Sequence, residues 1–287
     1  MRALRRLAVL TVLVLVLSGC ANSLFYYPND TVYLTPEDAA LSYEDVYFES
    51  LDKTRLHGWF LPARGKAWGT VIHFHGNAGN ITANLNMMGF MPYQGLNLFM
   101  FDYRGYGKSE GHPDRKGVYE DSLSALRYVL ARPDVDKQRV FLLGQSLGGA
   151  NAIAVSASLN PETIRALVVD SSFYSYRSIV KDKIGTLPVL GWFKAPLSLI
   201  MATDSYHSGD MIGSISPTPV MILHGTKDRV IPYHHGEQLF ERAREPKTFV
   251  RVEGADHIEA LAPRNKVTRE KVLDFFRQAV RPPVLSN

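Results

Sequence analysis

The chain has 287 residues, of which 46% are hydrophobic and 21% are charged, a balance typical of a globular protein that buries a sizeable core and not of a disordered one. Three of its 32 basic residues and none of its 28 acidic residues lie in positions 1–20, so the formal net charge of +4 falls to +1 without that segment. The remaining charges are interspersed and form no Lys/Arg run, which excludes a nucleic-acid-binding protein.

The first 20 residues have the three regions of a secretory signal. A basic start, "MRALRR", is followed by an apolar run from Leu7 to Leu17 and a close of small residues that ends at Cys20. An apolar core of this length is well short of the roughly 20 residues that a spanning helix needs, which favours a cleaved signal over an uncleaved anchor. Because Cys20 is the only cysteine, no intramolecular disulfide is possible.

The sequence "LSGC" at positions 17–20 resembles the lipobox of bacterial lipoproteins. The resemblance implies that residues 1–20 are a lipoprotein signal peptide and that Cys20 is lipidated, which would anchor the protein to a membrane of the bacterial cell envelope. The absence of Asp after Cys20 favours the periplasm-facing side of the outer membrane over the inner membrane.

Residues 21–42 contain several aromatics and two prolines without a clear period, and we interpret them as a tether that becomes a packed arm. From residue 43 to residue 287 we expect one domain in which strands alternate with helices. The expected strands are 44–50, 56–62, 69–76, 96–105, 139–145, 164–172, 218–225 and 247–254. The first two alternate like a half-buried antiparallel pair, and the later ones are continuous apolar runs that suit parallel strands buried on both faces.

Helices are expected over residues 116–132, 147–160, 233–243 and 263–280. Residues 174–216 are too long for a simple crossover and are rich in apolar side chains, so we expect a cap or lid there, or a pair of surface helices that complete the core. The predicted fold is therefore α/β, with a mostly parallel eight-stranded sheet, helices on both faces and a short cap insertion.

A sharp corner follows the strand at 139–145. The sequence Gly144-Gln145-Ser146-Leu147-Gly148 matches the G-x-S-x-G nucleophile elbow, with a strand before it and a helix after it. Alone, the motif also fits a structural serine at a tight turn. A nucleophilic serine needs a base and an acid that orients the base.

Two later strand ends offer these partners. Asp228 follows the strand at 218–225, and His257 follows the strand at 247–254, which gives the chain order Ser, Asp, His. Parallel strands end at one rim of a sheet, so we expect His257 to be the general base and Asp228 to orient it. Asp170, at the end of the strand at 164–172, remains an alternative acid.

The turn "HGNAG" at 75–79 follows another strand and is rich in glycine. We expect an oxyanion hole formed by the backbone N–H of Leu147 and the N–H of Asn77. A tight turn into a helix would give the same sequence.

Histidines occur in pairs at His73 and His75 and at His234 and His235. Neither pair has a third ligand at suitable spacing in the sequence, so no metal site is predicted and no cofactor is expected.

The motifs "HGNAGN", "DYRGYGKSEG", "GQSLGG", "HGTKDRVIP" and "GADH" together resemble the α/β-hydrolase superfamily, and within it the Bem46-like and ABHD17-like serine hydrolases. The resemblance spans roughly residues 43–280 and implies a triad of Ser146, Asp228 and His257. It also suggests thioesters of lipidated proteins, such as palmitoyl thioesters, as one substrate class. Those relatives have a cysteine-rich N-terminus, however, and this chain has one cysteine, which argues against a depalmitoylase role in a cell envelope.

We therefore expect a membrane-anchored serine hydrolase that cleaves carboxylic esters or related acyl bonds through an acyl-enzyme on Ser146. Its expected partner is a small-molecule or lipid-like acyl substrate. A serine peptidase of the same fold and a non-catalytic envelope binding protein remain alternatives.

Overall fold

The structure is a computed structural model that describes residues 25–186, 190–202 and 205–280. The predicted signal peptide, Cys20 and the first residues of the tether lie outside the described residues. Within the described part of the chain, no helix has both the length and the apolar character required to cross a membrane.

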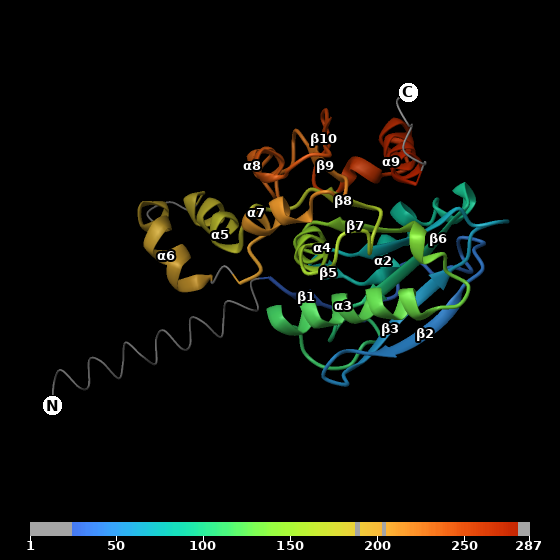
Figure 1. Ribbon diagram of the computed structural model, residues 1–287. Helices are drawn as coiled ribbons and strands as arrows, with labels where there is room; N and C mark the ends of the chain where they lie inside the picture. The colour runs from blue at the N-terminus through green and yellow to red at the C-terminus, as the bar shows by residue number, and fades with distance from the viewer. Residues whose placement is uncertain (1–24, 187–189, 203–204, 281–287) are drawn as a thin grey trace, which may run out of the picture.

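The centre of the molecule is one eight-stranded sheet, whose strand order is β10-β9-β8-β7-β4-β6-β3-β2 (Figure 1). Its strands are β2 (Glu44–Glu49), β3 (Arg55–Leu61), β4 (Gly69–Phe74), β6 (Leu96–Asp102), β7 (Val140–Gln145), β8 (Ala166–Asp170), β9 (Val220–Gly225) and β10 (Lys247–Val252). Only β3 pairs antiparallel with its two neighbours, and every other pairing is parallel. The predicted mostly parallel sheet of eight strands is confirmed.

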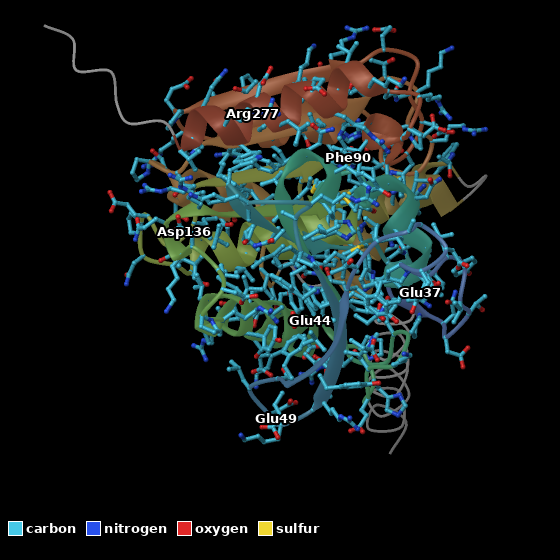
Figure 2. The ribbon with its side chains drawn as sticks, turned by 90° about the vertical axis from the view of Figure 1, so that its right-hand side faces the viewer. Glu37, Glu44, Glu49, Phe90, Asp136 and Arg277 are labelled. Atoms are coloured by element: carbon cyan, nitrogen blue, oxygen red, sulfur yellow. The ribbon has the colours of Figure 1, made fainter. Side chains whose placement is uncertain are left out.

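Burial along the strands follows their position in the sheet. Every residue of the central strands β4, β6, β7, β8 and β9 is buried, as expected for strands covered on both faces. The edge strand β2 alternates between buried and exposed residues. Figure 2 shows the charged side chains of Glu44 and Glu49 on this edge strand, where charge discourages pairing with another sheet.

Helices cover both faces of the sheet. They are α2 (Ile81–Met88), α3 (Arg115–Ala131), α4 (Leu147–Ala157), α5 (Tyr176–Gly185), α6 (Lys194–Met201), α7 (Ser208–Met211), α8 (His234–Arg242) and α9 (Lys266–Ala279). Short 3-10 helices are η1 (Pro92–Gln94), η2 (Lys137–Arg139), η3 (Leu190–Phe193), η4 (Ile212–Ile215) and η5 (Glu259–Leu261).

Two hydrophobic cores lie on the opposite faces of the sheet. One core contains buried side chains of α3, α4 and α8, and the other contains buried side chains of α2 and α9. Neighbouring residues of β7 alternate between them, with Leu142 in the first core and Phe141 and Leu143 in the second. This packing on both sides fixes the carboxyl end of β7, where Ser146 follows.

The insertion at 174–216 contains α5, η3, α6, α7 and η4. Figure 1 shows α5 and α6 side by side at one end of the molecule, beyond the carboxyl ends of the central strands and away from α9. The insertion therefore forms a small group of helices at this end of the sheet, here called the cap, and buried side chains of α5 and η4 also join the first core.

The N-terminal arm also packs on this end of the sheet. Its strand β1 (Tyr27–Pro28) pairs in parallel with β5 (Ala78–Gly79), the segment directly after Asn77. The described chain thus begins next to the loop that carries one of the predicted oxyanion donors.

Candidate active site

Ser146 lies at the sharp turn between β7 and α4. Its backbone angles, φ 55° and ψ −119°, are rare for a residue with a side chain. A Cβ atom at Gly148 would collide with the carbonyl oxygens of Phe74 and His75, and one at Gly149 would come within 2.7 Å of Ser172 Cβ. Positions 148 and 149 must therefore be glycines for the chain to hold Ser146 at this turn.

Three strand ends bring Ser146, His257 and Asp228 together. The Nε2 atom of His257 lies 3.0 Å from Ser146 Oγ, and its Nδ1 atom lies 2.8 Å from Asp228 Oδ2. Ser146 and Asp228 are buried, and the side chain of His257 is 16% exposed. A base in contact with both a hydroxyl and a carboxylate is the geometry that nucleophilic catalysis by serine requires.

The surroundings of Asp228 fix its orientation. Its Oδ1 accepts hydrogen bonds from the backbone N–H groups of Val230 and Ile231, both at 2.8 Å, which leaves Oδ2 for His257. With a carboxylate at Nδ1, the neutral imidazole carries its proton on that atom. Nε2 then has its lone pair directed at Ser146 Oγ and can accept the hydroxyl proton.

Asp170, the alternative acid, has other partners. Its carboxylate accepts hydrogen bonds from Gln145 Nε2 at 2.9 Å and from Ser171 Oγ at 3.0 Å. Burial raises the pKa of this carboxyl to about 6, against the smaller opposite effect of those two hydrogen bonds. Ser171 Oγ also accepts a hydrogen bond from the N–H of Ile258, the residue after His257. Asp170 therefore contacts the segment that carries His257 indirectly, through Ser171.

Asp256, next to the histidine in sequence, accepts the backbone N–H of His257 at 2.8 Å but is not hydrogen-bonded to its ring. Its carboxylate pairs with the guanidinium of Arg229 and accepts the N–H of Arg229 at 3.0 Å. Hydrogen bonds from the backbone and side chain of Arg229 hold the pKa of this carboxyl well below its usual range. Asp228 is therefore the acid that contacts the ring of His257.

The two predicted oxyanion donors lie beside Ser146. Leu147 is the first residue of α4, where a backbone N–H has no partner within the helix, and Leu147 and Asn77 line the same cavity as Ser146. The carbonyl of Asn77 accepts hydrogen bonds from the N–H of Tyr27 at 2.9 Å and from Tyr106 Oη at 2.8 Å. These bonds fix the peptide that leads out of Asn77, and one of them comes from the N-terminal arm.

A mostly apolar pocket of about 420 Å³ opens over Ser146. This volume lies within the range of about 300 to 1,000 Å³ that is usual for small-molecule sites. Besides Asn77, Ser146 and Leu147, the pocket is lined by Phe25, Tyr27, Phe173, Ile179, Val180, Lys183, Ile184, Val230 and Ile231.

Four parts of the chain thus form the walls of the pocket: the arm, Phe173 in the segment after β8, the cap helix α5 and the loop after Asp228. Sequence reasoning missed the contribution of Phe25 and Tyr27. The cluster of aromatics at 25–27 is the signal that could have suggested it.

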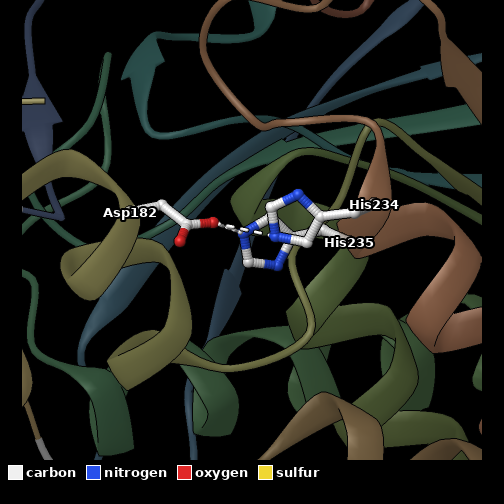
Figure 3. Close-up of side chains that lie close together, drawn as sticks. All are labelled: Asp182, His234 and His235. Carbon is white, nitrogen blue, oxygen red and sulfur yellow. Dashed lines mark hydrogen bonds and ion pairs between the residues drawn. The ribbon is translucent and has the colours of Figure 1, made fainter. Parts of the chain in front are cut away.

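Among the residues that the structure describes, one group of side chains outside this site could hold a metal ion. The Oδ2 atom of Asp182, on α5, lies 2.9 Å from His234 Nε2 and 3.0 Å from His235 Nε2. Figure 3 shows Asp182 pointing at both rings, so the third ligand that the sequence pattern lacks comes from the cap.

The hydrogen bonds of His235 argue against a metal at this group. Its Nδ1 accepts the backbone N–H of Tyr174 at 3.2 Å, so Nε2 carries the ring proton and donates it to Asp182. A metal-binding histidine instead donates from its second nitrogen. Burial lowers the pKa of His235 to about 4, which keeps the ring neutral near pH 7. The group therefore fastens the cap helix α5 to α8.

Among the described residues, His73 and His75 belong to no group of three or more side chains that could hold a metal ion. Both rings are buried, His73 beside Gln145 Oε1 at 3.1 Å and His75 beside the carbonyl of Gly76 at 2.7 Å.

The strand order, the elbow and the cap together define a serine hydrolase of the α/β-hydrolase class. The profile of the prolyl oligopeptidase family matches residues 88–282, which is more than half of the chain. The chain therefore belongs to the prolyl oligopeptidase family, and its relatives are of the Bem46-like type.

Three relatives show the extent of the similarity. The protein YfhR of Escherichia coli K12 is 40% identical over 267 residues, which cover 91% of this chain and 89% of YfhR. The α/β-hydrolase domain-containing protein WAV2 of Arabidopsis thaliana is 34% identical, over 92% of this chain and 85% of WAV2. The protein bem46 of Schizosaccharomyces pombe is 34% identical, over 69% of this chain and 64% of bem46.

An esterase of Pyrococcus furiosus has a similar structure. The TM-score is 0.72, the identity is 23%, and the match covers 90% of this chain and 98% of the esterase. At this identity the likeness concerns the fold, and it confirms the predicted α/β-hydrolase architecture.

Proposed function

We propose that this protein is a serine hydrolase that cleaves carboxylic esters or related acyl bonds, including thioesters, through an acyl-enzyme on Ser146. The observation that carries the proposal is the hydrogen-bonded series from Asp228 through His257 to Ser146 at the floor of an apolar pocket. The pocket offers apolar walls for an acyl group, and the triad offers the chemistry.

The first half of the proposed reaction forms the acyl-enzyme. Ser146 Oγ attacks the substrate carbonyl carbon while its proton passes to His257 Nε2, and Asp228 stabilises the resulting imidazolium. The N–H groups of Leu147 and Asn77 stabilise the negative oxygen of the tetrahedral intermediate. When the C–O bond of an ester or the C–S bond of a thioester breaks, the leaving alkoxide or thiolate takes the proton from His257 and departs as an alcohol or a thiol.

The second half releases the acid. A water molecule gives its proton to His257 Nε2 as its oxygen attacks the acyl carbon. His257 then returns the proton to Ser146 Oγ when the ester bond to the enzyme breaks. The products are a carboxylic acid and the regenerated serine.

A fluorophosphonate probe tests this proposal. It should label the wild-type protein and leave Ser146→Ala unlabelled, whereas Ser214→Ala should label like the wild type, because Ser214 lies on η4, outside the pocket. Labelling of Ser146→Ala at the wild-type level would refute the proposal, provided that both variants have the melting temperature of the wild type.

A serine peptidase is the second candidate, because the matching family is named for its oligopeptidases. The lining of the pocket favours the esterase: its one charged side chain is Lys183, and none of the described residues that line it is a carboxylate that could pair with the amino group of a peptide. Comparing the rates on matched ester and aminoacyl-amide substrates distinguishes the two. A non-catalytic binding protein would hydrolyse neither.

The proposal for location rests on the sequence alone. Lipidation of Cys20 would anchor the enzyme in the bacterial cell envelope, with the outer membrane favoured. Metabolic labelling with a radioactive fatty acid should mark the wild type and not Cys20→Ser, and labelling of both would refute this anchor.

A further inference from the structure

The mouth of the pocket carries exposed apolar side chains. Tyr27 and Val230 line the pocket and are 51% and 44% exposed, and Trp192, on η3 of the cap, is 91% exposed. An indole that is almost fully exposed is unusual in a protein that buries most of its large apolar side chains. Tryptophan is, however, enriched where proteins meet the interface of a lipid bilayer.

Trp192 belongs to the part of the cap that packs beside a wall of the pocket. Its neighbour Gly191 packs against the C-terminal end of α5, where a Cβ on Gly191 would lie 3.1 Å from the carbonyl oxygen of Gly185. The two residues that precede Gly185, Lys183 and Ile184, line the pocket. The exposed indole and the opening of the pocket therefore belong to the same end of the cap.

Two basic side chains lie at this end of the cap. Lys183 is exposed at the pocket, and the exposed Lys194 has its side chain beside Gly185. The nearby carboxylates have partners: Asp182 contacts the two histidines of α8, and Asp256 contacts Arg229. The pocket mouth thus combines apolar and positively charged side chains, which complements a bilayer with anionic headgroups.

The start of the described chain also lies at the mouth. Phe25 lines the pocket and follows Cys20 closely in the sequence. The chain from Cys20 to Phe25 spans at most about 17 Å when it is fully extended. If Cys20 is lipidated, the anchor therefore holds the mouth within about that distance of the membrane surface.

We propose that the cap surface beside the pocket, formed by Trp192 and Lys194 together with the pocket-lining Lys183, Tyr27 and Val230, docks on an anionic lipid bilayer, and that the substrate is an acyl ester resident in that bilayer. The acyl chain passes from the membrane into the apolar pocket over Ser146 and does not cross water as a free molecule. This proposal rests on the proposed hydrolase function, because it names the source of the acyl substrate for the same site.

Tryptophan fluorescence tests the docking directly. The full chain is reconstituted into vesicles that contain phosphatidylglycerol and lipids with brominated acyl chains, which quench an indole inserted among them. Trp59 is 4% exposed and the partly buried Trp68 packs against the core on the α2/α9 face of the sheet, so Trp192 is the indole on the proposed docking surface. Quenching in the wild type should fall at least about twofold in Trp192→Phe. Equal quenching in the two proteins, or none in either, would overturn the proposal.

Activity on two substrates links the docking to catalysis. Trp192→Glu should lower hydrolysis of a vesicle-embedded long-chain ester about tenfold or more and leave hydrolysis of a water-soluble short-chain ester unchanged. The matched control is Val267→Glu, which places the same charge at a 71% exposed apolar residue of α9, far from the cap in Figure 1. Equal loss on both substrates, or the same loss in the control, would overturn the proposal.

The two hypotheses fail separately. If Ser146 reacts with the fluorophosphonate and the soluble ester is hydrolysed, the hydrolase function stands even when no brominated lipid quenches Trp192. If Ser146 does not react and neither ester is hydrolysed, the function fails whatever the fluorescence shows.

Discussion

Replacing Asp228 with asparagine should inactivate the enzyme without unfolding it. The two backbone N–H groups that face Oδ1 can only donate, so the amide oxygen of the introduced asparagine must take that position. The amide NH₂ then faces His257 Nδ1 in place of Oδ2, 2.8 Å away in the wild type. The ring must accept there and carry its proton on Nε2, where it can no longer accept the proton of Ser146.

A wrong tautomer of this kind lowers kcat about 10⁴-fold in a serine protease, which corresponds to about 5.5 kcal/mol of transition-state stabilisation. We expect a loss of about that size for Asp228→Asn, measured as kcat on a soluble short-chain nitrophenyl ester. The melting temperature should change little, since both backbone hydrogen bonds remain.

Two matched variants make this prediction sharp. Asp256→Asn removes a carboxylate that pairs with Arg229 and should leave kcat within about threefold of the wild type. Asp170→Asn should cost less than Asp228→Asn, because Asp170 contacts Gln145 and Ser171 and does not hydrogen-bond to the histidine ring. If Asp228→Asn kept a tenth of the activity while Asp170→Asn lost nearly all of it, Asp170 would be the acid.

Three further predictions concern the parts that hold the site. Tyr106→Phe removes one of the two donors to the Asn77 carbonyl and should lower kcat several-fold with little change in KM. The free energy of unfolding, measured by urea titration, should fall by about 1 kcal/mol. An unchanged kcat would show that this hydrogen bond does not position the loop that carries Asn77. Gly148→Ala places a methyl group on the Phe74 carbonyl and should abolish fluorophosphonate labelling, and normal labelling of that variant would contradict the packing at the elbow. Burial lowers the pKa of His73 from 6.5 to about 3, so the unfolded chain binds a proton there between these pH values and the folded chain does not. The neutral ring therefore lowers the free energy of unfolding as the pH falls from 6.5 toward 3, by about 3 kcal/mol at about pH 4.5. Urea titrations at about pH 7 and 4.5 should show a smaller loss of this free energy for His73→Gln than for the wild type.

Much of the fold can be predicted from the sequence because local patterns and the packed structure agree. The strand predicted at 69–76 is observed at Gly69–Phe74, and the helix predicted at 116–132 is observed at Arg115–Ala131. Strands buried on both faces must be apolar along their whole length, so their pattern survives without knowledge of their neighbours. Chain order and the rule that parallel strands end at one rim then suffice to bring Asp228 and His257 toward Ser146.

The walls of the pocket could not be predicted in the same way. Phe25 and Tyr27 reach the site through a two-residue pairing with β5, which has no periodic signal of its own. The contact of Asp182 with His235 joins residues 53 positions apart on two different helices, and only the position of the cap creates it. Such contacts depend on tertiary packing, which single-sequence patterns do not encode.

The central claim is that Ser146 becomes acylated during turnover. Intact-mass and peptide mass spectrometry on protein that is acid-quenched during hydrolysis of a short-chain ester tests it most directly. We predict that the mass of one acyl group appears on the peptide that contains Ser146, disappears as substrate is consumed, and is absent in Ser146→Ala. Product formation by the wild type with no acyl group on Ser146, or with the acyl group on another residue, would contradict the account.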